Sequence, residues 1–328
     1  MNFSLAQKSL PTHVLMAVLL CAFCLPPVQS HAAAPLSIGT NPQGTAAYAV
    51  GAAVANVSSE VAGMQMRVVP QGGPPVTIPM VNKGSLEFSV ANGLVVAAAH
   101  AGTLMYKDRP HEKLRLLCNV FPLHLGYVVQ KDSDIQSIAD LKGKRVPSRY
   151  TKQKNLDVMA GGLLATVGLT WDDVEGIPVP NGARGVDDFA AGSADCAFFS
   201  LSSGKMLQAN ASVNGIRVLP IPETTQAKQA IQENIPGSMI IEIDPEETKY
   251  PGIMVKTRVL SQPFLITVSA DVSEDTAYAL VKALYNSKNK MVAMHKSFNA
   301  FNPESMYLDI GVPYHPGAVK FFQEVGLK

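Results

Sequence analysis

Short apolar segments alternate along the chain with longer stretches in which apolar residues recur at helical spacing. A strand is predicted at residues 36–38, and the helix after it carries apolar residues three or four positions apart from Ala47 to Val61. Further strands are predicted at residues 64–69, 86–90, 114–120 and 125–130. Repeated strand and helix units of this kind predict an α/β fold with mainly parallel sheets.

A second series of the same kind begins after the segment 140–146. It alternates predicted helices at residues 156–167 and 185–191 with strands at residues 174–179 and 194–199. An apolar run at residues 259–268 then leads to a helix after Ser273, which we expect to rejoin the first series. The pattern predicts two lobes, residues 35–124 with 260–328 and residues 125–259, with a ligand cleft between them.

The N-terminal residues have the pattern of a signal peptide. Lys8 precedes an apolar run at residues 14–25, then a proline pair and small residues up to Ala34. Cleavage after Ser30, Ala32 or Ala34 fits this pattern equally well, and a buried N-terminal helix is the alternative. The run is shorter than the roughly twenty residues that span a bilayer, so we expect a periplasmic protein that is not membrane-embedded.

Composition and charge limit the kinds of partner that the protein is expected to have. The chain has 328 residues, of which 47% are hydrophobic and 16% charged, as in ordinary globular proteins. Without residues 1–34 it carries 26 Lys and Arg against 26 Asp and Glu, which argues against a nucleic-acid partner. Cys21 and Cys24 lie in the signal peptide, and we expect Cys118 and Cys196 to be buried thiols, a disulfide between them being the alternative.

No catalytic sequence signature is present. The chain lacks G-x-S-x-G, H-E-x-x-H, G-x-G-x-x-G and the phosphate-binding G-x-x-x-x-G-K-[ST]. Asp108 and His111-Glu112 lie in a polar stretch that favours a solvated loop over a metal site. We therefore expect a non-enzymatic protein without metal or cofactor. Two alternatives stay open: a hydrolase using Cys196 or a serine of residues 200–203, and a sensory or adhesive surface protein.

Loops that join strand ends to helix starts hold the candidate ligand contacts of the first lobe. Unpaired N–H groups at a helix start attract carboxylate or phosphate oxygens. The segment after the first strand offers Thr40, Asn41, Gly44 and Thr45, although Thr45 as a simple helix cap is equally expected. The turns that follow the next two strands add Gly73, Pro74 and Asn92.

The second lobe offers a basic loop at residues 148–154. Arg149 can clamp a carboxylate through two hydrogen bonds, and Tyr150 and Thr151 stand beside it, although an exposed basic loop is the simpler interpretation. Phe199 and Ser202 follow another predicted strand, where the serines of this loop can also only cap the next helix. Together these residues predict a site for a small organic anion.

Several segments resemble the TAXI family of solute receptors, which serve TRAP-type transporters. The resemblance rests on residues 38–40 with Gly44 and Tyr48, on Gly72-Gly73, and on three later segments, residues 138–146, 192–199 and 315–318. It implies a periplasmic binding protein fold of type II, hinged between two lobes and expected to be monomeric. It also implies a small acid such as glutamate or 2-oxoglutarate as ligand, Tyr48 as a further contact, and the membrane subunits of a TRAP transporter as partners.

Two departures from the family's pattern concern loops that face the expected cleft. Residues 147–154 contain no glycine where such receptors have a glycine- and serine-rich loop. Pro74-Pro75 stand where the family has Gly-Ser. The ligand can therefore differ from the familiar acids, while the added cations still favour an anion.

Overall fold

The computed structural model describes residues 35–328, so the predicted signal peptide, with Cys21 and Cys24, lies outside the described residues. The strands are β1 Leu36–Thr40, β2 Met66–Pro70, β3 Phe88–Asn92, β4 Leu114–Gln130, β5 Arg145–Ser148, β6 Glu175–Pro178, β7 Ala197–Ser200, β8 Ile216–Val218, β9 Met239–Ile243 and β10 Thr257–Ser269. The helices are α2 Ala46–Glu60, α3 Pro74–Asn82, α4 Gly93–Ala101, α5 Lys154–Ala165, α6 Gly182–Ala190, α7 Gly204–Ser212, α8 Thr225–Asn234, α9 Pro245–Thr248, α10 Glu274–Tyr285, α11 Lys288–Met294 and α12 Pro316–Glu324.

Eight strands form one mixed sheet. Its order is β2-β1-β3-β10-β4-β7, with β8 paired to β4 and β9 paired to β10, while β5 and β6 form a separate parallel pair. β1 is parallel to β2 and β3, but β4 and β10 are antiparallel to every strand they pair with. The predicted α/β class is confirmed. The expectation of mainly parallel sheets is wrong, because two long strands of opposite direction run through the centre.

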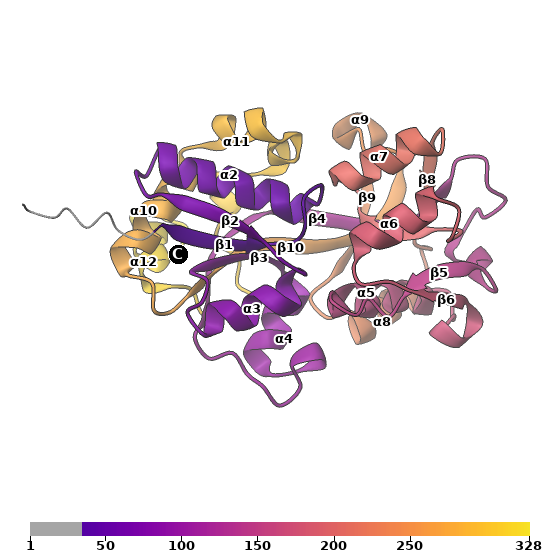
Figure 1. Cartoon of the computed structure of the whole chain (residues 1–328), viewed down its shortest axis with the longest axis horizontal. Helices are drawn as coiled ribbons and strands as arrows, with labels where there is room; N and C mark the ends of the chain where they lie inside the picture. Colours follow the sequence, from indigo (N-terminus) through magenta and orange to yellow (C-terminus); the bar gives the residue numbers. More distant parts are fainter. Residues whose placement is uncertain (1–34) are drawn as a thin grey trace, which may run out of the picture. The chain divides into compact units, whose positions relative to one another are not determined.

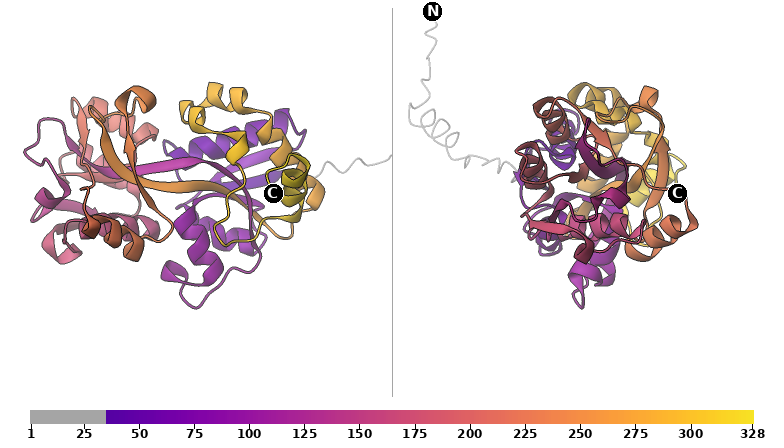
Figure 2. Two further views of the ribbon diagram at one scale, coloured as in Figure 1. Left: turned by 180° about the vertical axis from the view of Figure 1, so that it is seen from behind. Right: turned by 90° about the vertical axis from the view of Figure 1, so that its right-hand side faces the viewer.

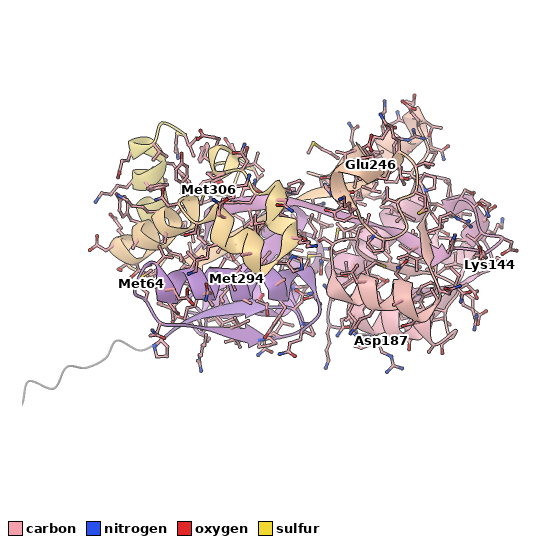
Figure 3. All side chains as sticks on the ribbon, turned by 90° about the horizontal axis from the view of Figure 1, so that it is seen from above. Met64, Lys144, Asp187, Glu246, Met294 and Met306 are labelled. Atoms are coloured by element: carbon pink, nitrogen blue, oxygen red, sulfur yellow. The ribbon has the colours of Figure 1, made fainter. Side chains whose placement is uncertain are left out.

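β4 and β10 connect two groups of elements (Figures 1 and 2). The first group contains β1–β3, α2–α4 and α10–α12, and the second contains β5–β9 and α5–α9 (Figure 1). Along β10, residues 264–268 pair with β3 and residues 257–261 pair with β9. Figure 3 labels Met306 in the first group and Asp187 in the second. Both groups thus contain part of β4 and part of β10.

Residues 114–130 form one strand rather than the two predicted from sequence. Pro122 interrupts the apolar pattern, and proline normally weakens a central strand because it has no N–H to donate. Here its register partner on β10 is Pro263, so two residues that lack the donor face each other. The strand therefore continues through the proline, at the point where β4 passes from one group to the other.

The segment 315–318 closes the first group. His315 caps α12: its Nδ1 accepts from the N–H of Gly317 at 3.3 Å, and its Nε2 lies 2.9 Å from the carbonyl oxygen of Val272. Gly317 lies against α10, where a Cβ would stand 2.1 Å from the carbonyl oxygen of Glu274. The segment on which the family resemblance partly rests therefore has a packing role.

Replacing Gly317 by Ala is expected to destabilise the protein by about 1–3 kcal/mol, because the new methyl group meets backbone atoms that cannot move aside. Urea denaturation followed by circular dichroism measures the change. Gly204→Ala is the matched control, since its Cβ would approach no atom more closely than 3.4 Å. Equal midpoints for the two variants would show that α10 and α12 adjust freely.

The two cysteines of the described chain are buried and free, as the sequence predicts. Cys118 lies in β4, and Cys196 immediately precedes β7. Over residues 35–328, no helix combines the length and apolar character needed to cross a membrane. The same residues contain no group of three or more His, Cys, Asp or Glu side chains placed to hold a metal ion.

Candidate functional site

A small cavity lies where the two groups meet β4 and β10. Its volume is about 40 Å³, which is space for only a few water molecules. It is lined by Asn41, Thr45, Ala46, Ala47, Pro74, Asn92, Leu123, Leu125, Gln153, Asn155, Leu156, Met159, Phe199, Ser200 and Phe264. None of these side chains is charged. The six polar ones belong to residues that are at most 5% exposed, so any ligand polar group enters a nearly dry site.

The start of α2 presents free N–H groups to this cavity. Thr45 caps the helix, since its Oγ1 accepts from the N–H of Tyr48 at 3.1 Å. The N–H groups of Ala46 and Ala47 have no acceptor among the described residues, and both residues line the cavity. Free N–H groups at the positive end of a 15-residue helix favour an anion at this position.

The start of α5, in the second group, also has free N–H groups beside this cavity. Gln153 precedes the helix without capping it, because its Oε1 accepts from the N–H of Gly182 at 3.0 Å. The N–H groups of Lys154 and Asn155 have no acceptor in residues 35–328. Asn155 is 1% exposed, and its Oδ1 is buried without a hydrogen-bond partner. A buried amide oxygen without a partner is costly and indicates a missing donor at this place.

Two further helix starts at the cavity have fewer donors to offer. Pro74 and Pro75 open α3 and carry no N–H. At the start of α4, the N–H of Leu94 donates to Gln262 Oε1 at 3.0 Å, and the N–H of Val95 donates to Asn92 Oδ1 at 3.2 Å. The free donors of the site therefore come from α2 and α5, one helix from each group.

The two groups contact each other through loops that carry or adjoin lining residues of the cavity. The backbone N–H of Lys205, at the start of α7, donates to the carbonyl oxygen of Gly44 at 2.9 Å. A Cβ on Gly72 would stand 3.3 Å from the carbonyl oxygen of Lys152, so those two loops also lie against each other. The two groups are thus in contact around a cavity too small for an organic acid.

Comparison with known proteins places the chain in a family. The model of the NMT1-like family matches residues 38–326, nearly the whole described chain. The chain belongs to the NMT1-like family. This NMT1-like chain is similar in fold to MatC from Rhodopseudomonas palustris with bound malate, at 10% identity and a TM-score of 0.57, over 81% of this chain and 89% of MatC. A structure described as a periplasmic transporter gives 14% identity and a TM-score of 0.57, over 90% of this chain and 94% of that one. The NMT1-like chain therefore has the fold of periplasmic solute-binding proteins.

The cavity of the NMT1-like chain collects five of the residues predicted from sequence, namely Asn41, Thr45, Pro74, Asn92 and Phe199. Two others support the lining from behind. Thr40 is fully buried, and its hydroxyl donates to the carbonyl oxygen of Asn41 at 2.9 Å. Gly73 has a φ of +95°, and a Cβ there would lie 2.9 Å from Asn41 Nδ2.

Three other predicted residues lie outside the lining. Gly44 has a φ of +82° and supplies the carbonyl that meets Lys205. The hydroxyl of Tyr48 accepts from Gln43 Nε2 at 3.1 Å, and Ser202 Oγ lies 3.2 Å from Ser200 Oγ. Ser200 belongs to the same predicted loop, whose serines were expected as ligand contacts, helix caps or the nucleophile of an alternative enzyme, and it is the serine of this loop that reaches the cavity.

The basic loop of the NMT1-like chain differs most from expectation. Arg149 is exposed and Tyr150 is fully buried, and neither lines the cavity, nor does the exposed Thr151. The cause is the backbone after β5, where Arg149 and Tyr150 both have positive φ, +61° and +25°. This turn directs the Tyr150 ring into the core, where burial raises its pKa. The expected clamp by Arg149 is therefore absent from this lining.

Two lining residues that were not predicted from the sequence lie shortly after this turn in the chain. Gln153 lies near the end of the basic loop and Asn155 directly follows it, and their position at a helix start was a readable signal that the neighbouring cations obscured. Leu123, Leu125 and Phe264 come from β4 and β10 and had no signal, since any buried strand residue has the same apolar character.

The alternative hydrolase finds no support in this geometry. Cys196 is completely buried, and burial raises the pKa of its thiol, which keeps it protonated. Ser203 caps α7 by accepting from the N–H of Met206 at 3.2 Å. Of the hydrogen bonds that residues 35–328 form, the one made by the Ser200 hydroxyl joins it to Ser202, which is not a base.

His124 of the NMT1-like chain is a buried base next to the cavity wall. It lies on β4 between two lining leucines, with Nδ1 3.2 Å from the hydroxyl of Tyr250 and Nε2 buried without a partner in the described chain. Burial lowers the pKa of His124 to about 4. Between this pKa and the unfolded value, the unfolded chain binds the extra proton, so the free energy of unfolding falls as the pH falls from about 6.5 to about 4.

Replacing His124 by Gln is expected to remove part of this acid sensitivity. Between pH 7.5 and pH 5, the free energy of unfolding of the unsubstituted protein should fall by roughly 2 kcal/mol more than that of His124→Gln. Urea denaturation at the two pH values measures both decreases. Equal decreases would mean that His124 is protonated in the folded protein at pH 5.

Proposed function

We propose that this protein is a periplasmic solute receptor that binds a small organic anion and delivers it to a TRAP-type membrane transporter. The observation that carries the proposal is the pair of helix starts, α2 and α5, where Ala46, Ala47 and Asn155 have free N–H groups and line one uncharged, buried cavity. Each N–H bond to an anion is charge-assisted, and the two helix dipoles add to it. MatC, which has the same fold, is described with malate, an organic acid.

The polar side chains of the cavity suggest what else the ligand carries. Asn155 has a buried amide oxygen without a donor, and Asn41, Asn92 and Gln153 add three further amides. A hydroxyl or amino group beside the carboxylate supplies the donor that Asn155 lacks. The apolar remainder, with Phe199 and Phe264, suits a short carbon chain. We infer a small carboxylic acid with a hydroxyl or amino group, a class that includes the glutamate-like acids of the TAXI resemblance, whereas the keto group of 2-oxoglutarate has no hydrogen to donate to Asn155.

Binding of such an acid requires the two groups to separate. The lobes proposed are residues 35–124 with 260–328 and residues 125–259, joined by β4 and β10. The acid first meets the donors of α2, and closure then adds those of α5, because only the closed form has both sets in place. Residues 1–34 act as the signal peptide, and the exported protein is a monomer without cofactor.

Thermal unfolding of the purified protein against a panel of small acids tests the function. An acid present at 100 times its dissociation constant is expected to stabilise the protein by about 2.7 kcal/mol, whereas the corresponding amide or alcohol is not. Stabilisation by the uncharged analogues alone, or by amines, would contradict an anion site.

A further inference from the structure

A second and larger hollow lies on the other side of β4 and β10. Its volume is about 750 Å³. Its floor is formed by residues of the two long strands, and its walls come from α4 and the segment after it, from the turn before β9 and from the loop before α12. It is lined by Gly93, Leu94, Ala97, Ala98, Ala101, Thr103, Leu104, Asn119, Pro122, Pro236, Gly237, Met239, Ser261, Pro263, Leu308, Asp309 and Ile310. We call this hollow the α4 groove.

The α4 groove and the cavity use neighbouring residues of the same elements. Pro263 lines the groove and Phe264 lines the cavity, and Pro122 and Leu123 are divided in the same way. Successive side chains of a strand point to opposite faces of the sheet, so the two hollows lie back to back. The α4 groove is therefore a different site from the proposed anion site. β4 and β10 lie between the two hollows and contribute residues to both.

The lining of the α4 groove is apolar and open to solvent. Leu104, Met239 and Leu308, on three separate segments, are 45%, 60% and 38% exposed. Large apolar side chains gathered around a concave surface usually mark a binding site rather than ordinary surface. Their exposure costs free energy that an apolar occupant would recover.

The charges of the α4 groove limit the kind of occupant. Asp309 is the one charged side chain among the lining residues, and it is exposed. An anionic amphiphile such as a fatty acid would meet this carboxylate and no compensating cation. An uncharged apolar molecule is not repelled by the Asp309 carboxylate.

We propose that the α4 groove binds a small, uncharged apolar molecule. A volume of about 750 Å³ lies in the range of small-molecule sites, which are mostly apolar with a few polar groups, here Asn119, Ser261 and Thr103. A concave floor with walls on three sides suits a small molecule, whereas a protein interface needs a broad, accessible face. The proposal is independent of the anion site, because no residue lines both hollows.

The test is a fluorescence titration of the full chain with Nile red, an uncharged apolar dye. We expect saturable binding of one dye per chain. Ala97 lies half-buried on the groove face of α4, so Ala97→Phe fills the groove and is expected to raise the dissociation constant at least about tenfold. Ala52→Phe, at a half-buried position of α2 outside the groove, should leave it within about twofold and controls for folding and surface apolarity.

Competition defines the class of ligand. 1-Octanol is expected to displace Nile red at a concentration at least about tenfold lower than octanoate, which has the same chain with an anionic head. Non-saturable dye binding, equal affinities of Ala97→Phe and Ala52→Phe, or displacement by octanoate as readily as by octanol would each overturn the proposal. The titrations with Nile red and with 1-octanol contain no organic anion, so failure of the anion site leaves their results unaffected.

Discussion

Replacing Asn155 by Asp is expected to weaken the binding of small organic acids by at least about 100-fold. The substitution keeps the shape of a side chain that is 1% exposed and lines a cavity without cations. Burial raises the pKa of a carboxyl at this helix start, as it does for Asp157, but the free N–H groups and the dipole of α5 favour the ionised form, so we expect the new carboxylate to be charged at pH 7.5. It then repels the ligand carboxylate at close range, by about 4 kcal/mol at 4 Å and an effective dielectric constant of 20.

Isothermal titration calorimetry with an acid identified by the thermal screen measures this loss. Asn155→Ala removes the amide without adding charge, and only about a tenfold loss is expected from it. Asn302→Asp makes the same charge change outside the cavity and should leave the affinity unchanged, since Asn302 Oδ1 merely accepts from the N–H of Glu304. An Asn155→Asp variant that binds acids as well as Asn155→Ala would show that no ligand anion lies near α5.

Replacing Ala46 by Pro is expected to weaken acid binding by roughly 10- to 150-fold, because it removes one N–H donor from the cavity. Ala46 is the first residue of α2, where proline is well tolerated. Thr45 before it has φ −93° and ψ 157°, an extended conformation that proline accepts in its neighbour. The helix should therefore remain intact while the donor is lost.

Thr225→Pro is the matched control for this substitution. Thr225 is the first residue of α8, it follows an extended Thr224, and it does not line the cavity. Calorimetry should give an unchanged affinity for Thr225→Pro, and circular dichroism should show both variants folded. If both variants lost affinity equally, the effect would come from general destabilisation. If neither did, the N–H of Ala46 would not contact the ligand.

The features that could be predicted from the sequence are those that depend on residues close together in the chain. The helix start at Thr45 and the strand end at Asn92 depend on nearby residues, and both residues lie in the lining of the cavity. The α/β class follows from periodicity, which is also local. The long antiparallel strands were missed because Pro122 is tolerated only through Pro263, a partner far away in the sequence.

The second half of the site shows why composition alone was insufficient. The cations around Arg149 suggested electrostatic clamping, but the direction of a side chain depends on backbone dihedral angles that its neighbours set. Two residues with positive φ turn Arg149 outward and leave the helix start at Asn155 facing the cavity. Charge in the site thus comes from the backbone of two helices rather than from a side chain.

A crystal structure of the protein with a bound organic acid would show which groups hold the ligand carboxylate. We expect the carboxylate oxygens at about 3 Å from the backbone nitrogens of Ala46 or Ala47 and of Lys154 or Asn155, with Arg149 still directed outward. A carboxylate held by Arg149 or another cation, with these nitrogens bonded to water, would contradict this expectation.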